Sequence, residues 1–100
     1  MPEDGAGALV ELALYVNPAS VACLRVRGQI EAALSEFDAA RIRFEVLDVT
    51  SAAEQAERDR VLFTPTLVKR RPGPPAWLVG DSGVQLVGTL LVSCGVEKAR

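Results

Sequence analysis

The chain has 100 residues, of which 49% are apolar and 24% charged, a composition that allows one compact domain with a modest hydrophobic core. Eleven basic and thirteen acidic residues give a net charge of −2, and no basic run extends beyond Lys69, Arg70 and Arg71, so we expect no nucleic-acid partner. The sequence contains no histidine, which excludes Ser-His-Asp and Cys-His catalysis and every His-containing zinc site. We therefore expect one domain over residues 1–100, with no metal and no cofactor.

The N-terminal residues and the cysteines indicate the compartment. Glu3 and Asp4 stand where a secretory signal would carry basic residues, and the apolar run at residues 8–16 is interrupted by a glutamate and too short to span a bilayer. Cys23 and Cys94 lie far apart, unlike the closely spaced cysteines of small secreted domains. We expect a cytoplasmic protein with reduced thiols and no membrane partner.

The first half of the chain predicts a strand, a helix and a second strand. Residues 9–16 are apolar with a single charge, which is typical of a central strand buried on both faces. Asn17 is predicted to cap a helix that has Pro18 at its first position. Residues 41–49 alternate between polar and apolar and predict the second strand, which must be parallel to the first and joined to it by a right-handed crossover. The expected apolar face of the helix consists of Cys23, Val26, Ile30, Ala33, Leu34 and Phe37.

Shorter elements are expected next. The composition of residues 50–60 favours a short exposed helix, with Thr50 or Ser51 available as its cap. Residues 61–68 look like a strand but include Pro65, and a proline within a strand marks a place where pairing is interrupted.

The end of the chain completes the fold. Residues 70–75 predict a turn, and residues 76–81 a short strand that forms an antiparallel hairpin with the preceding one. Residues 82–95 combine apolar residues at helical spacing with glycine and β-branched residues, so the sequence does not decide between a helix and a strand there. The last five residues are expected to fray, which leaves an ordered core at residues 8–95. The resulting order β-α-β-(α)-β-β-α defines an α/β fold of thioredoxin-like arrangement, in which the bond before Pro65 is expected to be cis.

A series of short motifs runs along the chain: Leu14-Tyr15-Val16, Asp48-Val49 at the end of the second strand, Thr64-Pro65-Thr66-Leu67, Lys69, the proline-rich turn at residues 70–75, and Val79-Gly80-Asp81. Together these motifs resemble the KaiB family. This resemblance covers roughly residues 9–92 and implies a KaiB-like clock or timer protein, not an enzyme, that binds a KaiC-type hexameric ATPase and modulates its phosphorylation or ATPase cycle. It also implies a sensor kinase as a further partner and a homo-oligomer, dimer or tetramer, at rest. Family members switch between a thioredoxin-like form and a resting form of order β-α-β-β-α-α-β, which requires two packings of similar free energy.

The same resemblance suggests functional positions. The partner-binding surface would include Arg60 and Lys69, which fall where the family carries lysines. Glu45 stands in place of a usual lysine and reverses one charge on that surface. Leu90 replaces a usual aspartate close to Gly88, in the region tied to fold switching. These departures favour a homologue outside the cyanobacterial clock.

Cys23 supports a different hypothesis, a thiol-based redox sensor or oxidoreductase of thioredoxin-like fold. A thioredoxin site needs two thiols at Cys-x-x-Cys, whereas Ser20 and Val26 occupy the flanking positions here. Because Cys23 lies on the apolar helix face, packing in the core is the favoured interpretation. A stand-alone thioredoxin-like sensory module is a further alternative, although the sequence offers no kinase segment in its support.

Other polar and aromatic residues have two interpretations each. Tyr15 and Trp77 are expected to complete the core, with a partner contact as the alternative for Trp77. No two acidic residues are placed in one sheltered pocket by the sequence, so no catalytic residue is assigned. A basic face that meets acidic residues of a partner, or an ordinary solvated surface, would be formed by Arg58, Arg60, Lys69, Arg70 and Arg71.

Overall fold

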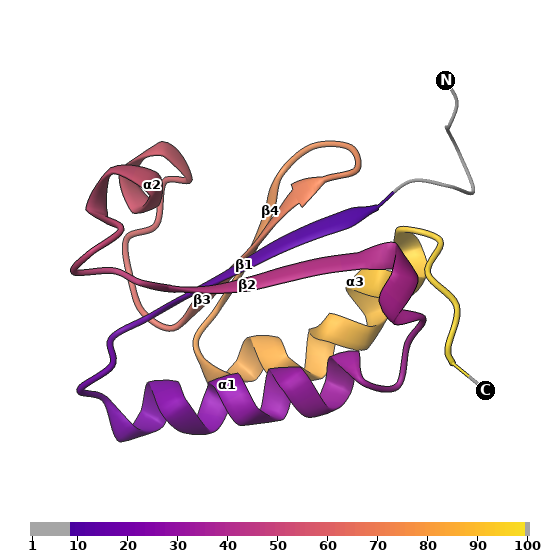
Figure 1. Ribbon diagram of the computed structural model, residues 1–100, viewed down its shortest axis with the longest axis horizontal. Helices are drawn as coiled ribbons and strands as arrows, with labels where there is room; N and C mark the ends of the chain where they lie inside the picture. The colour runs from indigo at the N-terminus through magenta and orange to yellow at the C-terminus, as the bar shows by residue number, and fades with distance from the viewer. Residues whose placement is uncertain (1–8, 100) are drawn as a thin grey trace.

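The computed structural model describes residues 9–99 and contains one four-stranded sheet in the order β2-β1-β3-β4 (Figure 1). The N-terminal Glu3 and Asp4 lie outside the described residues. Strands β1 and β2 are parallel, whereas β3 is antiparallel to both β1 and β4. The strands are β1 (Val10–Val16), β2 (Ile42–Asp48), β3 (Thr66–Arg71) and β4 (Ala76–Val79).

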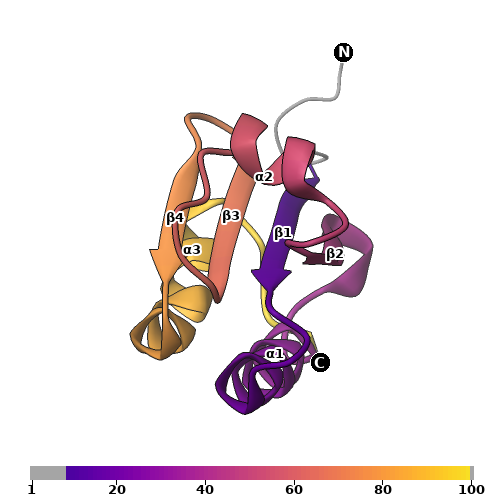
Figure 2. The same ribbon diagram turned by 90° about the vertical axis from the view of Figure 1, so that its left-hand side faces the viewer.

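Helices cover both faces of the sheet. Two of them, α1 (Val21–Leu34) and α3 (Val87–Ser93), lie against one face, and the short α2 (Ala53–Arg58) lies over the other (Figures 1 and 2). Two 3₁₀ helices, η2 (Ala39–Arg41) and η3 (Asp81–Leu86), lead into β2 and α3. The element order confirms the predicted thioredoxin-like arrangement and differs from the alternative order β-α-β-β-α-α-β.

Strand β1 is central, as predicted, and all but one of its residues are buried. Its side chains alternate between two cores because successive residues of a strand point to opposite faces. Leu12 and Leu14 belong to the larger core, which α1 and α3 complete. Ala13 and Tyr15 belong to the smaller core under α2, together with Ala56 and Val68.

The predicted start of α1 is wrong. The helix begins at Val21, and the side chain of Ser20 caps it by accepting a hydrogen bond from the Cys23 N–H at 3.2 Å. Asn17 instead closes a turn, in which its side-chain oxygen accepts from the Ala19 N–H at 3.0 Å. Ser, Asn and Asp all make good caps, so local sequence alone does not decide between these two positions.

The predicted cap of α2 is also wrong. This helix begins at Ala53, and its N-cap residue makes no side-chain capping bond. The N–H and hydroxyl of Thr50 both donate to Oδ1 of Asp48, at 2.8 and 2.6 Å. These two bonds, that of the hydroxyl first, lower the pKa of the Asp48 carboxyl. Thr50 therefore stabilises the turn after β2 and does not cap the helix.

Two further boundaries differ from the prediction. Strand β3 begins at Thr66 and not at Val61, so residues 61–65 form a loop. The C-terminal residues were expected to fray, yet Val96 is 2% exposed and the chain returns to the end of α1. There the Asp38 N–H donates to the Glu97 carbonyl at 3.0 Å, which pairs this segment with the loop before β2.

Candidate protein-interaction surface

Asp59, at the C-terminal end of α2, is the centre of a polar network on the α2 face of the sheet. Its Oδ2 accepts hydrogen bonds from the Tyr15 hydroxyl at 2.6 Å and from Nε of Arg70 at 3.0 Å. A second guanidinium nitrogen lies 2.9 Å from the same oxygen, and the third donates to Oε2 of Glu45 at 2.8 Å. The network therefore joins the end of α2 to β1, β2 and β3.

The protonation states of this network follow from burial and hydrogen bonding. Burial raises the pKa of Tyr15, and the hydrogen bond to Asp59 raises it further. Burial by itself would lower the pKa of Arg70, but its hydrogen bonds to Asp59, Glu45 and Tyr15 outweigh that effect and raise the pKa. At neutral pH the network consequently contains a neutral phenol and a charged guanidinium.

Trp77 lies at the margin of this network. Its indole N–H donates to the backbone carbonyl of Asp59 at 2.8 Å, while the residue stays 40% exposed. The prediction that Trp77 completes the core is therefore wrong, and its contact with a partner remains a prediction. Together with Arg58, Arg60 and Pro75, it lines a hollow of about 510 Å³.

Arg60 is exposed and lies two residues beyond the end of α2. Its backbone is in the left-handed region, with φ of 57°, and its N–H donates to the Glu57 carbonyl at 3.1 Å. Within residues 9–99, Arg58 and Arg60 form no ion pair, whereas Arg70 is paired twice. The charges of these two arginines are therefore open to solvent or to a partner.

Lys69 lies elsewhere. It is 7% exposed, and its ammonium group donates to the Pro72 carbonyl at 2.5 Å. It pairs with Leu12 in the register of β1 and β3, and strand alternation places it on the face covered by α1 and α3. Arg71 lies 3.9 Å from Glu11 at the opposite end of β3 from Pro65. The five basic residues thus do not form one face.

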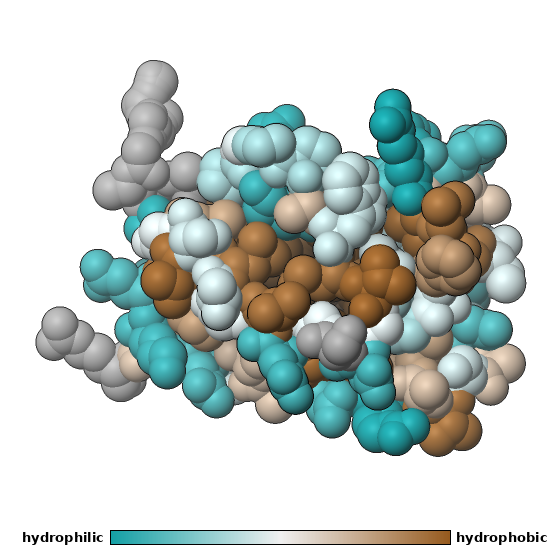
Figure 3. Space-filling model, turned by 180° about the vertical axis from the view of Figure 1, so that it is seen from behind, coloured by the Kyte–Doolittle hydropathy of each residue, from teal (hydrophilic) through white to brown (hydrophobic). Residues whose placement is uncertain are grey.

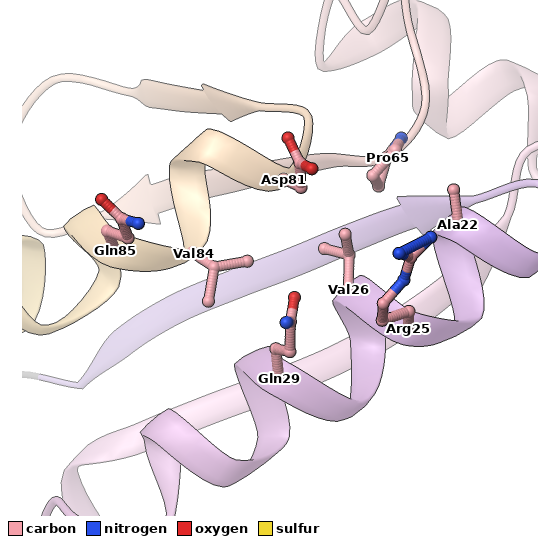
Figure 4. A pocket seen from close by; sticks show the side chains of 8 residues that line it. All are labelled: Ala22, Arg25, Val26, Gln29, Pro65, Asp81, Val84 and Gln85. Carbon is pink, nitrogen blue, oxygen red and sulfur yellow. The ribbon is translucent and has the colours of Figure 1, made fainter.

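Pro65 follows a cis peptide bond, and so does Pro72. The carbonyl of Pro65 accepts from the Gly80 N–H at 2.8 Å, which joins the start of β3 to the end of β4. Beside Pro65, a pocket of about 670 Å³ lies between α1 and η3 and is lined by residues of both. Figure 4 shows Arg25 of α1 and Asp81 of η3 among its lining side chains, and no cysteine lines it.

Cys23 is buried, as its position on the helix face predicts. It is 1% exposed, and its sulfur accepts a hydrogen bond from the Asn17 N–H at 3.5 Å. Cys94 is partly buried, and neither cysteine forms a disulfide. A thiol attack on a protein substrate would require Cys23 to become accessible.

Gly88 and Leu90 both lie in α3. Gly88 is close to Phe37, because a Cβ atom at this position would lie 3.7 Å from the edge of the ring. Leu90 is partly buried and packs against the larger core. Both residues therefore help to join α3 to the rest of the fold, and their role in fold switching remains a prediction.

The part of the chain that the structure describes offers no further kind of site. Among residues 9–99, no group of three or more potential metal ligands is present. Over the same residues, no helix combines the length and the apolar character needed to cross a membrane.

Sequence reasoning missed two features of the α2 face. Leu62 is 84% and Phe63 67% exposed, although the prediction placed them in a strand. The contact between Tyr15 and Asp59 was also missed, because the two residues are 44 positions apart and no local pattern links them. Two adjacent large apolar residues before a proline-interrupted strand are the signal that could have indicated a loop.

These observations first define a class of protein. It is an α/β protein of thioredoxin-like fold that lacks a Cys-x-x-Cys pair and presents an exposed surface around α2. The model of the KaiB domain matches residues 13–93, and the chain belongs to the KaiB family. It is 29% identical over 72 residues to the circadian clock protein KaiB3 of Synechocystis sp., a match that covers 72% of this chain and 71% of that protein.

Solved structures show the same fold. The N-terminal domain of SasA from Synechococcus elongatus matches with a TM-score of 0.75 and 21% identity, over 94% of this chain and 90% of that domain. The germline-specific thioredoxin Deadhead of Drosophila melanogaster matches with a TM-score of 0.72 and 17% identity, over 87% of this chain and 83% of that protein. At these identities the likeness concerns the fold alone.

Proposed function

We propose that the chain is a clock or timer protein that binds a KaiC-type hexameric ATPase and modulates its phosphorylation or ATPase cycle. The observation that carries this proposal is the KaiB family match over residues 13–93. The similarity to a circadian clock protein over 72 residues supports it. The chain would act by binding and not by catalysis.

The contact with the ATPase is proposed to include Arg60. This residue is exposed and has no ion-pair partner within residues 9–99, so its charge is available to acidic groups on another protein. Lys69, the other position suggested by the family resemblance, directs its ammonium group to the Pro72 carbonyl in this fold. Its contribution to a contact would need that hydrogen bond to break.

The thiol hypothesis has less support. Cys23 is 1% exposed, and a resolving cysteine at Cys-x-x-Cys spacing is absent from the sequence. Reactive cysteines are usually accessible to solvent, and Cys23 is not.

We further propose that the chain is cytoplasmic and forms a homo-oligomer at rest. A sensor kinase is proposed as a second partner. Gly88 and Leu90 are proposed to belong to a region that changes its fold when the chain switches between its two forms. The thioredoxin-like form described above corresponds to the form that, in the family resemblance, binds the ATPase.

Size-exclusion chromatography tests the main proposal. The purified chain is run alone and after incubation for hours with the KaiC-type ATPase of the same organism and ATP. We expect it to move into the hexamer peak, and we expect Arg60→Glu to weaken this shift. Arg25→Glu is the matched control, because Arg25 is an exposed arginine on α1 and its substitution changes the net charge equally. Absence of any complex with the wild-type chain would refute the proposal.

A further inference from the structure

The loop between α2 and β3 presents two adjacent large apolar side chains to solvent. Leu62 is 84% exposed and Phe63 is 67% exposed. A single exposed leucine is common on protein surfaces, but a leucine and a phenylalanine side by side expose a larger apolar area at one point. We call these two residues the apolar pair.

The backbone on both sides of the apolar pair is held in place. Before it, the Val61 N–H donates to the Ala56 carbonyl at 2.9 Å. After it, the Thr66 hydroxyl donates to the Phe63 carbonyl at 2.7 Å, and Thr66 itself is 2% exposed. The apolar pair is therefore presented by an anchored loop, and little conformational entropy is lost when a partner covers it.

Two hollows, each lined by at least one arginine, lie beside the apolar pair. On one side, Leu62 and Arg60 line a hollow of about 690 Å³ with Val49 and Ala53. On the other side of Arg60, the hollow of about 510 Å³ contains Arg58 and Trp77. In Figure 3, strongly hydrophilic side chains stand beside apolar ones at the end of the molecule where α2 lies.

The charges around the apolar pair are not balanced. The carboxylate of Asp59 is already engaged by Tyr15 and Arg70. Arg58 and Arg60 have no ion-pair partner in the described part of the chain, and neither has Glu57, which lines the larger hollow together with Arg60. The unpaired side chains that line the two hollows therefore carry an excess of one positive charge. A complementary surface would therefore offer carboxylates to these two arginines.

We propose that Leu62 and Phe63 anchor the contact with the ATPase by entering an apolar recess on that partner, whose rim carries carboxylates facing Arg58 and Arg60. This inference rests on the proposed function and specifies its contact surface. Large apolar or aromatic side chains at the centre of an interface contribute most of its affinity, whereas charges at the rim mainly increase the association rate. The two groups should therefore have separable kinetic effects.

Binding kinetics with the immobilised ATPase and ATP test this inference. Leu62→Ser and Phe63→Ser, alone and together, are compared with Val92→Ser, a control on α3 with 61% exposure. We expect Phe63→Ser to weaken binding at least about tenfold, mostly by faster dissociation, and the control to change it less than about twofold. The variants should keep the wild-type circular dichroism spectrum, because the substituted side chains are exposed.

The charge part of the inference has its own readout. The double variant Arg58→Glu/Arg60→Glu should slow association and reduce the dependence of the association rate on salt concentration. Equal binding by Phe63→Ser and Val92→Ser would overturn the anchor while leaving the proposed function intact. A loss of oligomers of the free chain in Phe63→Ser, without a change in ATPase affinity, would also overturn it, because the apolar pair would then be a self-contact. If the wild-type chain does not bind, the proposed function itself fails.

Discussion

Replacing Asp59 with alanine should lower the free energy of unfolding by about 2–3 kcal/mol. One carboxylate oxygen accepts hydrogen bonds from the Tyr15 hydroxyl and from Nε of Arg70, and it lies 2.9 Å from a second guanidinium nitrogen of Arg70. A hydrogen bond to a charged group contributes about 1.5–3 kcal/mol. The Asp59 and Arg70 side chains are 18% and 28% exposed, so solvent screening reduces the sum of these contributions. Arg70 also keeps Glu45 as a partner, whereas the buried Tyr15 hydroxyl loses its acceptor.

Urea unfolding followed by the fluorescence of Trp77, the single tryptophan, measures this change. With a slope of about 1–1.5 kcal/mol per M, the midpoint should fall by about 1.3–3 M. Glu57→Ala is the control, because Glu57 lies on the same helix and forms no ion pair within residues 9–99. Its effect should stay within about 0.5 kcal/mol. An equally small effect of Asp59→Ala would show that the network does not hold α2 on the sheet.

Three further results are expected. The single tyrosine, Tyr15, has a raised pKa in the folded state, so its contribution to stability is complete below pH ~10 and is lost as the pH rises through the folded-state pKa. A pH titration followed by tyrosinate absorbance should show a midpoint above the ordinary pKa of tyrosine. A midpoint at or below that value would contradict the burial of Tyr15. Gly83→Ala should destabilise the protein by about 1–3 kcal/mol in thermal unfolding, because the new Cβ would lie 2.7 Å from Cβ of Leu78; an unchanged melting temperature would disprove that close packing. A thiol reagent should label the partly buried Cys94 before the buried Cys23, as peptide mapping would reveal, and the reverse order would revive the thiol hypothesis.

The parts of the fold that repeat a regular pattern could be predicted from the sequence. The continuous apolar run of β1 indicated a central strand, and its residues are buried on both faces. The apolar spacing in α1 indicated the face that packs on the sheet, including Cys23 and Ile30. Such patterns are informative because burial requires the period of the element itself.

Features decided by tertiary contacts could not be predicted. Ser20 and Asn17 are both good caps, and local sequence does not tell which of the two caps α1. The strand pattern around Lys69 predicts the face of the sheet on which its side chain lies, but it does not predict the hydrogen bond to the Pro72 carbonyl. The bond between Tyr15 and Arg70 joins residues 55 positions apart, a separation at which local sequence carries no information about contact.

The surface assigned to the partner shows the same limit. The family resemblance pointed to Arg60, which is exposed next to α2. Pro65 favours a loop at Leu62 and Phe63, but an apolar run before Thr66 is equally compatible with a buried strand, and the prediction chose the strand. Only the observed start of β3 at Thr66 reveals that the two side chains face solvent.

Native mass spectrometry of the KaiC-type hexamer, incubated with ATP and either the wild-type chain or Cys23→Ala, tests the central claim most directly. If the chain acts by protein contact and not through a thiol, both forms should add the same number of copies to the hexamer. Circular dichroism confirms beforehand that the variant is folded. A hexamer that gains no mass with the wild-type chain, or gains mass with the wild-type chain but not with the folded variant, would contradict the account.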